Sequence, residues 1–196
     1  KAQKLYQRYC DKDDLACVTG FVEHQLEPAQ NKKSDFSKKS DFSGSSSRTD
    51  VVHDLLAFLA EQMIAMNKEK QQVVEAFWLD LEGAADAGDF DTLRNRGKWE
   101  SSLWKAEACR PFVDEESRST RTLEESLGWN EAAYKAFVKM LMGNVGNFSG
   151  LVDAYRAHHP RYLALAERLA ATDRLIDEVV YRLYGLSEEE IEVVES

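Results

Sequence analysis

Proline and glycine are scarce in this chain, which has three prolines and ten glycines among 196 residues. Because these residues punctuate turns, their scarcity favours long helices over a β fold with many turns. Long hydrophobic runs are also missing, and none approaches the roughly 18 consecutive apolar residues that a membrane helix needs. We therefore expect an all-α protein that has no membrane as a partner.

A disulfide framework is not indicated, because the three cysteines, Cys10, Cys17 and Cys109, make an odd count without a close CxxC spacing. This usage is typical of reduced thiols in a cytoplasmic protein, and the chain has no secretory signal pattern. Cys10 and Cys17 are seven residues apart, so one helix would present both on one face. We expect them to be small core residues and not metal ligands.

Catalytic and cofactor-binding motifs are absent from the sequence. The prolines stand only at positions 28, 111 and 160, so the Asn/Asp-Pro-Pro-aromatic loop of an adenine-N6 methyltransferase does not occur. There is also no GxG turn for S-adenosylmethionine, no acidic residue two positions before a lysine for Mg²⁺, no P-loop and no HExxH. Adjacent His158 and His159 point apart, so we favour a surface or capping role over a metal site. We predict no catalytic, cofactor-binding or metal-binding residue, and whether the chain belongs to an enzyme stays open.

Positive charge is outnumbered, with 25 Lys and Arg against 35 Asp and Glu and a net charge of −10. Sequence-independent nucleic-acid binders normally carry the opposite sign, because their affinity comes from neutralising phosphates. Two local basic segments provide the candidate DNA phosphate contacts, which are Lys32, Lys33, Lys38, Lys39, Arg94, Arg96 and Lys98. Trp99 and Trp104 lie beside the second segment, and basic residues among aromatic ones suit a nucleic-acid surface. We favour the alternative of a solvated loop and a core-seeking tryptophan pair.

Two stretches carry apolar residues three or four positions apart, the pattern of helices that pack lengthwise. The first is expected to be a helix over 49–82, capped by Thr49 or Asp50. Its seam is Val52, Leu56, Leu59, Met63, Met66, Lys70, Val73, Phe77 and Leu81. The second is expected to open at Pro160 and run to residue 184, before Gly185. Its seam is Tyr162, Leu165, Leu169, Thr172, Ile176, Val179 and Leu183. We expect the two helices to pair in antiparallel fashion.

The polar seam residues Lys70 and Thr172 allow two interpretations. The simpler one is a lysine that reaches outward and a threonine in a loosely packed layer. The alternative is that both set the register between the helices.

The remaining segments are expected to be shorter. Residues 1–29 read as short helices, the second capped by Asp13, and residues 30–48 as a flexible Lys/Ser-rich linker with a KKSDFS repeat. Residues 49–196 form the helical domain, with short helices over 89–157 that include one around Trp99–Ala108 and one capped by Asn130. A terminal helix over 187–195 starts with a capping box of Ser187 and Glu190.

Two blocks resemble segments near the C-terminus of single-chain type II (type IIG-like) restriction–modification enzymes and related phage-defence adenine-N6 DNA methyltransferases. They are VVHDLLAFLAEQMIAMNKEKQ at Val51–Gln71 and ATDRLIDEVVYRLYGLSEEEIEVVE at Ala171–Glu195. In that family a methyltransferase core and a target recognition domain precede helices that end in a tail similar to Ile176–Ile191. Ser187 stands where threonine is common in that tail.

The resemblance implies a non-catalytic C-terminal helical scaffold that supports the target recognition domain of a DNA-modifying enzyme. Its partners would be DNA, through the parent enzyme, and the parent's own catalytic and recognition domains. S-adenosylmethionine and Mg²⁺ are implied only for that parent. The first residue, Lys1, is not methionine, which fits a C-terminal fragment. The alternative is a free-standing helical module that binds a partner protein through an exposed seam.

Overall fold

The computed structural model of the chain describes residues 1–26, 48–96, 105–113, 123–142 and 146–195. Within these ranges the regular structure is helical without any strand, which confirms the predicted all-α fold. The chain divides into two compact units. Unit 1 contains residues 1–66 and 168–196, and unit 2 contains residues 67–167.

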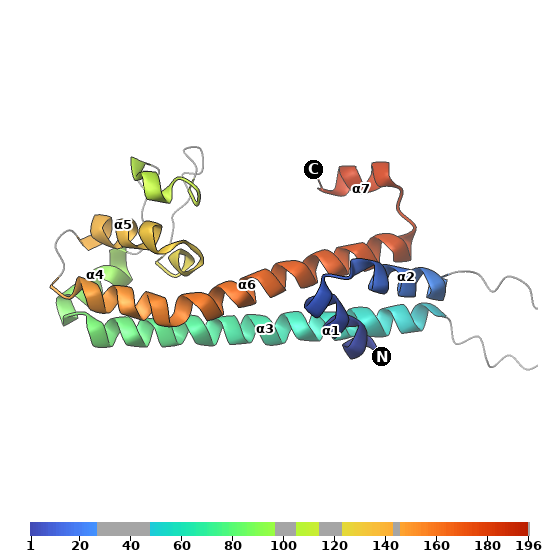
Figure 1. Cartoon of the computed structure of the whole chain (residues 1–196), viewed down its shortest axis with the longest axis horizontal. Helices are drawn as coiled ribbons and strands as arrows, with labels where there is room; N and C mark the ends of the chain where they lie inside the picture. The colour runs from blue at the N-terminus through green and yellow to red at the C-terminus, as the bar shows by residue number, and fades with distance from the viewer. Residues whose placement is uncertain (27–47, 97–104, 114–122, 143–145, 196) are drawn as a thin grey trace, which may run out of the picture. The chain divides into compact units, whose positions relative to one another are not determined.

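The two longest helices are α3 (Arg48–Ala84) and α6 (Phe148–Tyr184), which run antiparallel and contribute to both units (Figure 1). The prediction of a helix over 49–82 is confirmed to within two residues at each end. Most of its seam is buried, including Val52, Leu59, Phe77 and Leu81, so this seam forms internal packing. Capping by Thr49 or Asp50 was wrong, because the helix already begins at Arg48.

The start of the second long helix was predicted wrongly, since Pro160 lies inside α6 and the helix begins twelve residues earlier at Phe148. Asn147 caps this true start, with its Oδ1 accepting the N–H of Gly150 at 3.1 Å. A Cβ on residue 150 would come within 2.6 Å of the Asn147 side chain, so the tight turn favours glycine there. Proline costs a helix one backbone hydrogen bond, and burial of Leu151 and Tyr155 before it offsets that loss.

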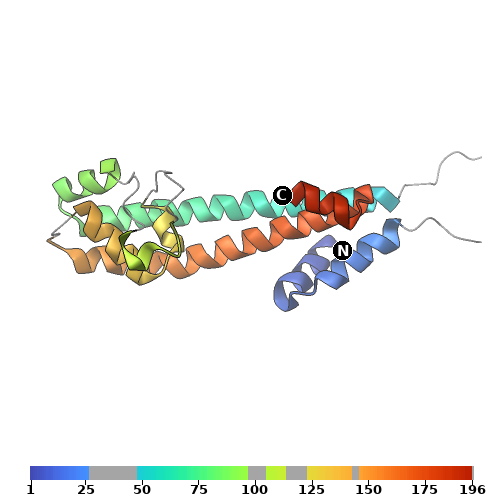
Figure 2. The same ribbon diagram turned by 90° about the horizontal axis from the view of Figure 1, so that it is seen from above.

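The N-terminal helices of unit 1 are α1 (Ala2–Lys12) and α2 (Leu15–Leu26), which lie beside α3 and α6 (Figure 2). Asp13 does not cap the second helix as predicted. It takes a left-handed conformation with φ 51° at the end of α1, and Asp14 Oδ1 accepts the N–H of Cys17 at 3.0 Å. Cys10 and Cys17 therefore belong to different helices. The prediction that both are core residues was wrong, because Cys10 is exposed and Cys17 half-buried.

The core of unit 1 is mainly aliphatic and joins residues that are far apart in the sequence. Its buried members are Val18, Val22, Val52, Leu55, Leu59, Leu175 and Val179, together with Tyr6 and Tyr9. The two tyrosines attach α1 to α6. Tyr6 Oη lies 2.8 Å from Thr172 Oγ1, and Tyr9 Oη donates to the Ala171 carbonyl at 2.9 Å.

Thr172 therefore does not sit in a loosely packed layer, because it is fully buried. Its Oγ1 donates to the Arg168 carbonyl at 2.7 Å, which leaves the Tyr6 hydroxyl to donate to Thr172. The polar seam position is a docking point for α1, which the helix periodicity alone did not indicate.

The end of α6 and the start of α7 (Glu188–Glu195) follow the predicted stop and start signals. Gly185 has φ 67°, the left-handed region, and its N–H donates to the Arg182 carbonyl at 3.2 Å. The Leu186 N–H donates to the Tyr181 carbonyl at 3.0 Å, which completes a Schellman motif. The capping box is confirmed, with Ser187 N–H to Glu190 Oε2 at 2.9 Å and Glu190 N–H to Ser187 Oγ at 3.3 Å.

Unit 2 contains α4 (Ala87–Arg96), the 3₁₀ turns η2 (Glu107–Cys109) and η3 (Glu125–Gly128), and α5 (Glu131–Met142). The cap of α5 is confirmed, since Asn130 Oδ1 accepts the Ala133 N–H at 2.9 Å. The core is rich in aromatic rings. Its buried aromatic residues are Phe77, Trp129, Tyr134, Phe137 and Tyr155.

Several predictions fall outside the described residues. They include the linker up to residue 47 and most of the helix expected around Trp99–Ala108, of which the end is the turn η2. No helix in the described ranges is long and apolar enough to cross a membrane.

Candidate functional site

The predicted phosphate contacts cannot be grouped into a site. Lys32, Lys33, Lys38, Lys39 and Lys98 lie outside the described residues, as do the side chains of Arg94 and Arg96 on α4. Trp99 and Trp104 are outside them too, whereas Lys105 and Arg110 are described and exposed. The DNA contacts therefore stay a prediction.

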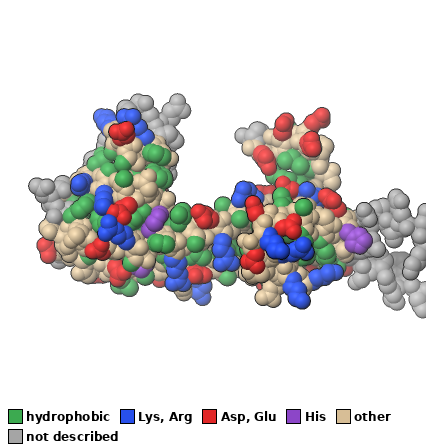
Figure 3. Space-filling model, in the orientation of Figure 1, with side chains coloured by type: hydrophobic (Ala, Val, Ile, Leu, Met, Phe, Trp, Pro, Cys, Tyr) green, Lys and Arg blue, Asp and Glu red, His purple; other side chains and the backbone are tan. Residues whose placement is uncertain are grey.

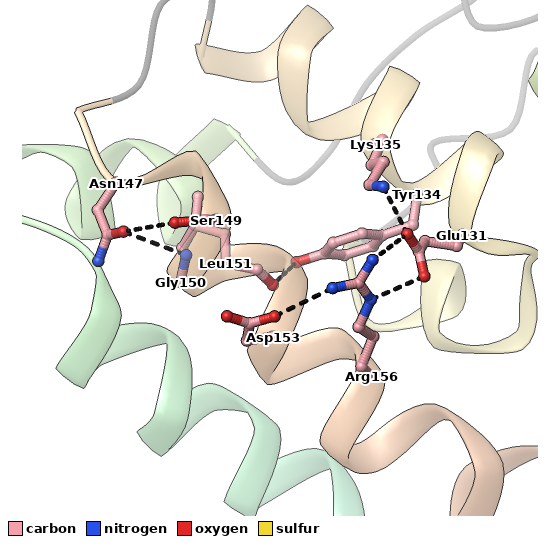
Figure 4. Close-up of polar contacts among 9 residues, drawn as sticks. All are labelled: Glu131, Tyr134, Lys135, Asn147, Ser149, Gly150, Leu151, Asp153 and Arg156. Carbon is pink, nitrogen blue, oxygen red and sulfur yellow. Dashed lines mark hydrogen bonds and ion pairs between the residues drawn. The ribbon is translucent and has the colours of Figure 1, made fainter.

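A cluster of four charged side chains in unit 2 joins α5 to α6 (Figure 4). Arg156 binds Glu131 in a bidentate pair, with Nε to Oε2 at 2.9 Å and Nη2 to Oε1 at 2.7 Å. Lys135 also contacts Glu131, and Asp153 accepts from Arg156 Nη1 at 3.2 Å. These partners, Arg156 before Lys135, lower the pKa of Glu131 from its usual 4.5 to about 2.

Two buried tyrosines lie next to this cluster and connect three segments of unit 2. Tyr134 and Tyr155 are stacked with ring centroids 4.4 Å apart. The Tyr134 hydroxyl donates to the Leu151 carbonyl at 2.9 Å, and the Tyr155 hydroxyl donates to the Trp129 carbonyl. Burial raises the pKa of Tyr155 to about 12 and that of Tyr134 further, so both remain protonated donors.

The adjacent histidines point to different segments, as predicted from their spacing. His158 Nε2 lies 2.7 Å from Asp80 Oδ2 of α3, and His159 Nδ1 donates to the Leu127 carbonyl of η3 at 2.7 Å. The prediction for both was a surface or capping role, and the structure shows half-buried rings that connect α6 to its neighbours, with His159 bonded to a carbonyl of η3. Among the described residues no group of three or more His, Cys, Asp or Glu could hold a metal ion.

A long groove on α3 is the candidate binding site, which we call the Trp78 groove. It consists of two hollows of about 680 Å³ and about 520 Å³ that share Glu75, Trp78 and Glu124. Trp78 Nε1 donates to Glu124 Oε1 at 2.7 Å, and its ring meets that of Phe90 edge-on at 6.2 Å. The half-buried tryptophan is thereby held at the junction of the hollows.

One end of the Trp78 groove is bounded by Lys70 and Tyr162. The Lys70 ammonium lies 4.9 Å from the centre of the Tyr162 ring, a cation–π contact between α3 and α6. Lys70 therefore does not merely reach into solvent, because it contacts a residue of the second seam.

The other end of the groove is acidic and apolar. Glu75, Leu79 and Glu82 line the smaller hollow, and Leu79 is 68% exposed. This end suits the binding of an apolar side chain flanked by positive charge. The sequence pattern gives no sign of this site, because these residues lie off the apolar seam and have the spacing of a solvent-facing side of the helix.

The C-terminal helix α7 of unit 1 also carries exposed apolar side chains. Val193 is 75% exposed and Val194 64%, and acidic side chains surround hydrophobic ones over α7 in Figure 3. The helix has no buried residue. Three of its acids, Glu188, Glu189 and Glu190, lie in the first turn, where the helix dipole stabilises negative charge.

Comparison of the chain with protein-family models, with curated proteins and with solved structures finds no match in any of the three. The residues themselves therefore carry the functional argument.

Proposed function

We propose that this chain is a non-catalytic helical scaffold of a DNA restriction–modification or DNA adenine methyltransferase protein, where it supports the target recognition domain. The observation that carries the proposal concerns the two blocks that resemble this family. Val52 and Leu59 of the first block share one hydrophobic cluster with Leu175 and Val179 of the second. Two blocks separated by about a hundred residues thus build a single core, as expected for a retained structural element.

Polar contacts in unit 2 also support a scaffold. Two of its ion pairs each join two segments: Glu131 and Arg156 connect α5 to α6, and Arg161 Nη2 reaches Glu69 of α3 at 2.9 Å. The shifted pKa values of Glu131 and Tyr155 have structural causes, namely ion pairing for Glu131 and burial for Tyr155. Side chains committed to holding helices together fit a bracing role.

The parent enzyme in this proposal is cytoplasmic and acts in phage defence. It would supply the S-adenosylmethionine site, any Mg²⁺ site and the base-reading contacts to DNA. The basic residues Lys32, Lys33, Lys38 and Lys39 would add phosphate contacts whose strength falls with salt.

Two measurements test the proposal. The coding sequence that precedes residue 1 should encode an α/β domain with an Asn-Pro-Pro-aromatic loop, and a native start at Lys1 would contradict it. The complete protein should methylate adenine in DNA. Leu175→Ala, which opens a cavity in the shared core, should lower its melting temperature and its activity together, with S-adenosylmethionine affinity unchanged.

The second candidate is a free-standing module that binds a protein partner. The seams of both long helices are mostly buried, which weighs against a module that binds its partner through an exposed seam. The Trp78 groove favours a different form, in which a separate surface of α3 does the binding. This candidate would be favoured if the complete protein showed no methylation activity and if it captured a protein partner that the Trp78→Ala variant did not capture.

A further inference from the structure

The exposed face of α3 in unit 2 carries a regular stripe of four residues. Glu75, Trp78, Leu79 and Glu82 follow the spacing i, i+3, i+4, i+7, so they share one side of the helix. The two glutamates are separated by seven residues, which corresponds to about 10 Å along the axis. The stripe therefore reads as an apolar pair between two carboxylates.

The apolar pair is accessible even though the surrounding unit is well packed. Leu79 is 68% exposed, and Trp78 is half-buried where the two hollows meet. A tryptophan fixed in a hollow is the kind of residue that contributes most to protein–protein affinity. Its indole N–H is already bonded to Glu124, so an incoming segment would meet the apolar part of the ring.

The carboxylates of the stripe have no partner within the described part of the chain. Neither Glu75 nor Glu82 forms a side-chain hydrogen bond or ion pair there, unlike Glu69, which binds Arg161 on the same helix. The larger hollow is also lined by Lys68 and Lys70, but the charged residues of the smaller hollow are all acidic, namely Glu75, Glu82 and Glu124. The negative charge of this end is complementary to a cationic segment and repels the phosphates of nucleic acid.

We propose that the Trp78 groove docks a basic amphipathic helix of a protein partner. The partner helix presents two Lys or Arg residues seven positions apart to Glu75 and Glu82, with apolar residues between them against Trp78 and Leu79. We expect the same spacing on the partner as on α3, because two helices that pack lengthwise present residues with the same repeat to each other. This inference stands on the groove alone and does not depend on the proposed function.

The test selects binders from a display library of helical peptides whose charged and apolar positions are both randomised. The target is the full chain, with counter-selection against binders of the Trp78→Ala variant. We expect enriched peptides to carry Lys or Arg at i and i+7 around an apolar pair. Failure to recover any Trp78-dependent peptide, or recovery of acidic or neutral ones, would overturn the proposal.

Charge reversal then decides whether the carboxylates act as described. For a synthesised basic peptide, Glu75→Lys combined with Glu82→Lys should raise the Kd at least about tenfold. The same double variant should bind the matched peptide with Glu at i and i+7, which the unaltered chain rejects. The control is Glu61→Lys, an exposed glutamate of α3 in unit 1, which should leave the Kd unchanged.

Leu79→Ser provides a variant that keeps the fold, since Leu79 is largely exposed, and it should also weaken binding several-fold. Salt should weaken binding to the unaltered chain but strengthen the residual binding of the double Lys variant, because it screens attraction in the first case and repulsion in the second. Displacement of the peptide by duplex DNA, or equal effects of Glu61→Lys and the double reversal, would refute a protein-binding groove.

Discussion

Unit 1 and unit 2 are both helical, but they differ in what holds their helices together. The core of unit 1 is mostly Val and Leu, with one buried hydroxyl pair between Tyr6 and Thr172. Unit 2 has stacked aromatic rings and polar contacts from α6 to α3, η3 and α5. The difference shows that periodic apolar spacing accounts for most of the core of unit 1, where α1 alone docks through tyrosine hydroxyls, whereas several segments of unit 2 are joined by specific side-chain partners.

The largest effect is expected when a ring is removed from the aromatic core of unit 2. Phe77→Ala should lower the free energy of unfolding by about 3–5 kcal/mol, because Phe77 is fully buried against Tyr134. Hydrogen exchange should rise most in unit 2, and urea denaturation gives the free energy. Leu59→Ala is the matched change in unit 1, and equal exchange in both units after either change would contradict separate cores.

A smaller effect is expected from the polar pair of unit 1. Thr172→Val should destabilise the chain by about 1–3 kcal/mol, because it leaves the buried Tyr6 hydroxyl without its oxygen partner. Adding Tyr6→Phe removes the orphaned group. The double variant should therefore lose less than the sum of the single losses in urea denaturation. Strict additivity would show that the pair does not couple α1 to α6.

Pro160→Ala should stabilise unit 2 by about 1 kcal/mol. The change restores a backbone N–H to the interior of α6, and the greater freedom of the unfolded chain offsets part of the gain. Thermal unfolding measures the difference. A loss of stability would show that the proline ring itself contributes packing at this position.

The smallest effect concerns the exposed pair of Glu131 and Arg156, and it depends on pH. Because the folded pKa of Glu131 is lowered to about 2 from 4.5, its stabilisation is present above pH 4.5 and is lost as pH falls towards 2. Glu131→Gln should lower the melting temperature slightly at pH 7 and have no effect near pH 2. High salt should reduce the difference at pH 7. Glu61→Gln provides a control on an exposed glutamate that has no ion pair with the described residues.

The long helices illustrate how much of the fold was predictable. Buried Val52, Leu59 and Val179 all lay on the predicted seams, because a lengthwise contact repeats its spacing in the sequence. Pro160 shows the limit of locating helix ends from the sequence. Proline is common in the first turn of a helix, so a proline inside a helix is easily taken for its start unless the preceding turns are known to be buried. The signal for the true start of α6 was Asn147, a residue type that caps helices with its side chain. The residues that follow it continue the apolar face of α6.

The candidate site was less predictable than the fold. Glu75 and Leu79 form a binding surface only because Phe90 of α4 and Glu124 at η3 build the walls of the groove. Phe90 lies 11 positions after Leu79 and Glu124 lies 34 positions after Phe90, and no periodic pattern links these segments. Lys70 was noticed as polar in an apolar seam, but its contact with Tyr162 required the pairing of α3 with α6.

The corner between α6 and α7 has a consequence for how the chain folds. Its backbone and capping hydrogen bonds span five residues or fewer, from Tyr181–Leu186 to Ser187–Glu190, whereas the contact of Tyr181 Oη with Glu195 Oε1 at 3.5 Å spans fourteen. Loop closure over such short distances costs little entropy, so this corner can form within the unfolded chain before either core assembles. The turn between α6 and α7 can therefore be specified by local contacts, and Gly185 supplies a left-handed backbone conformation that other residues would resist.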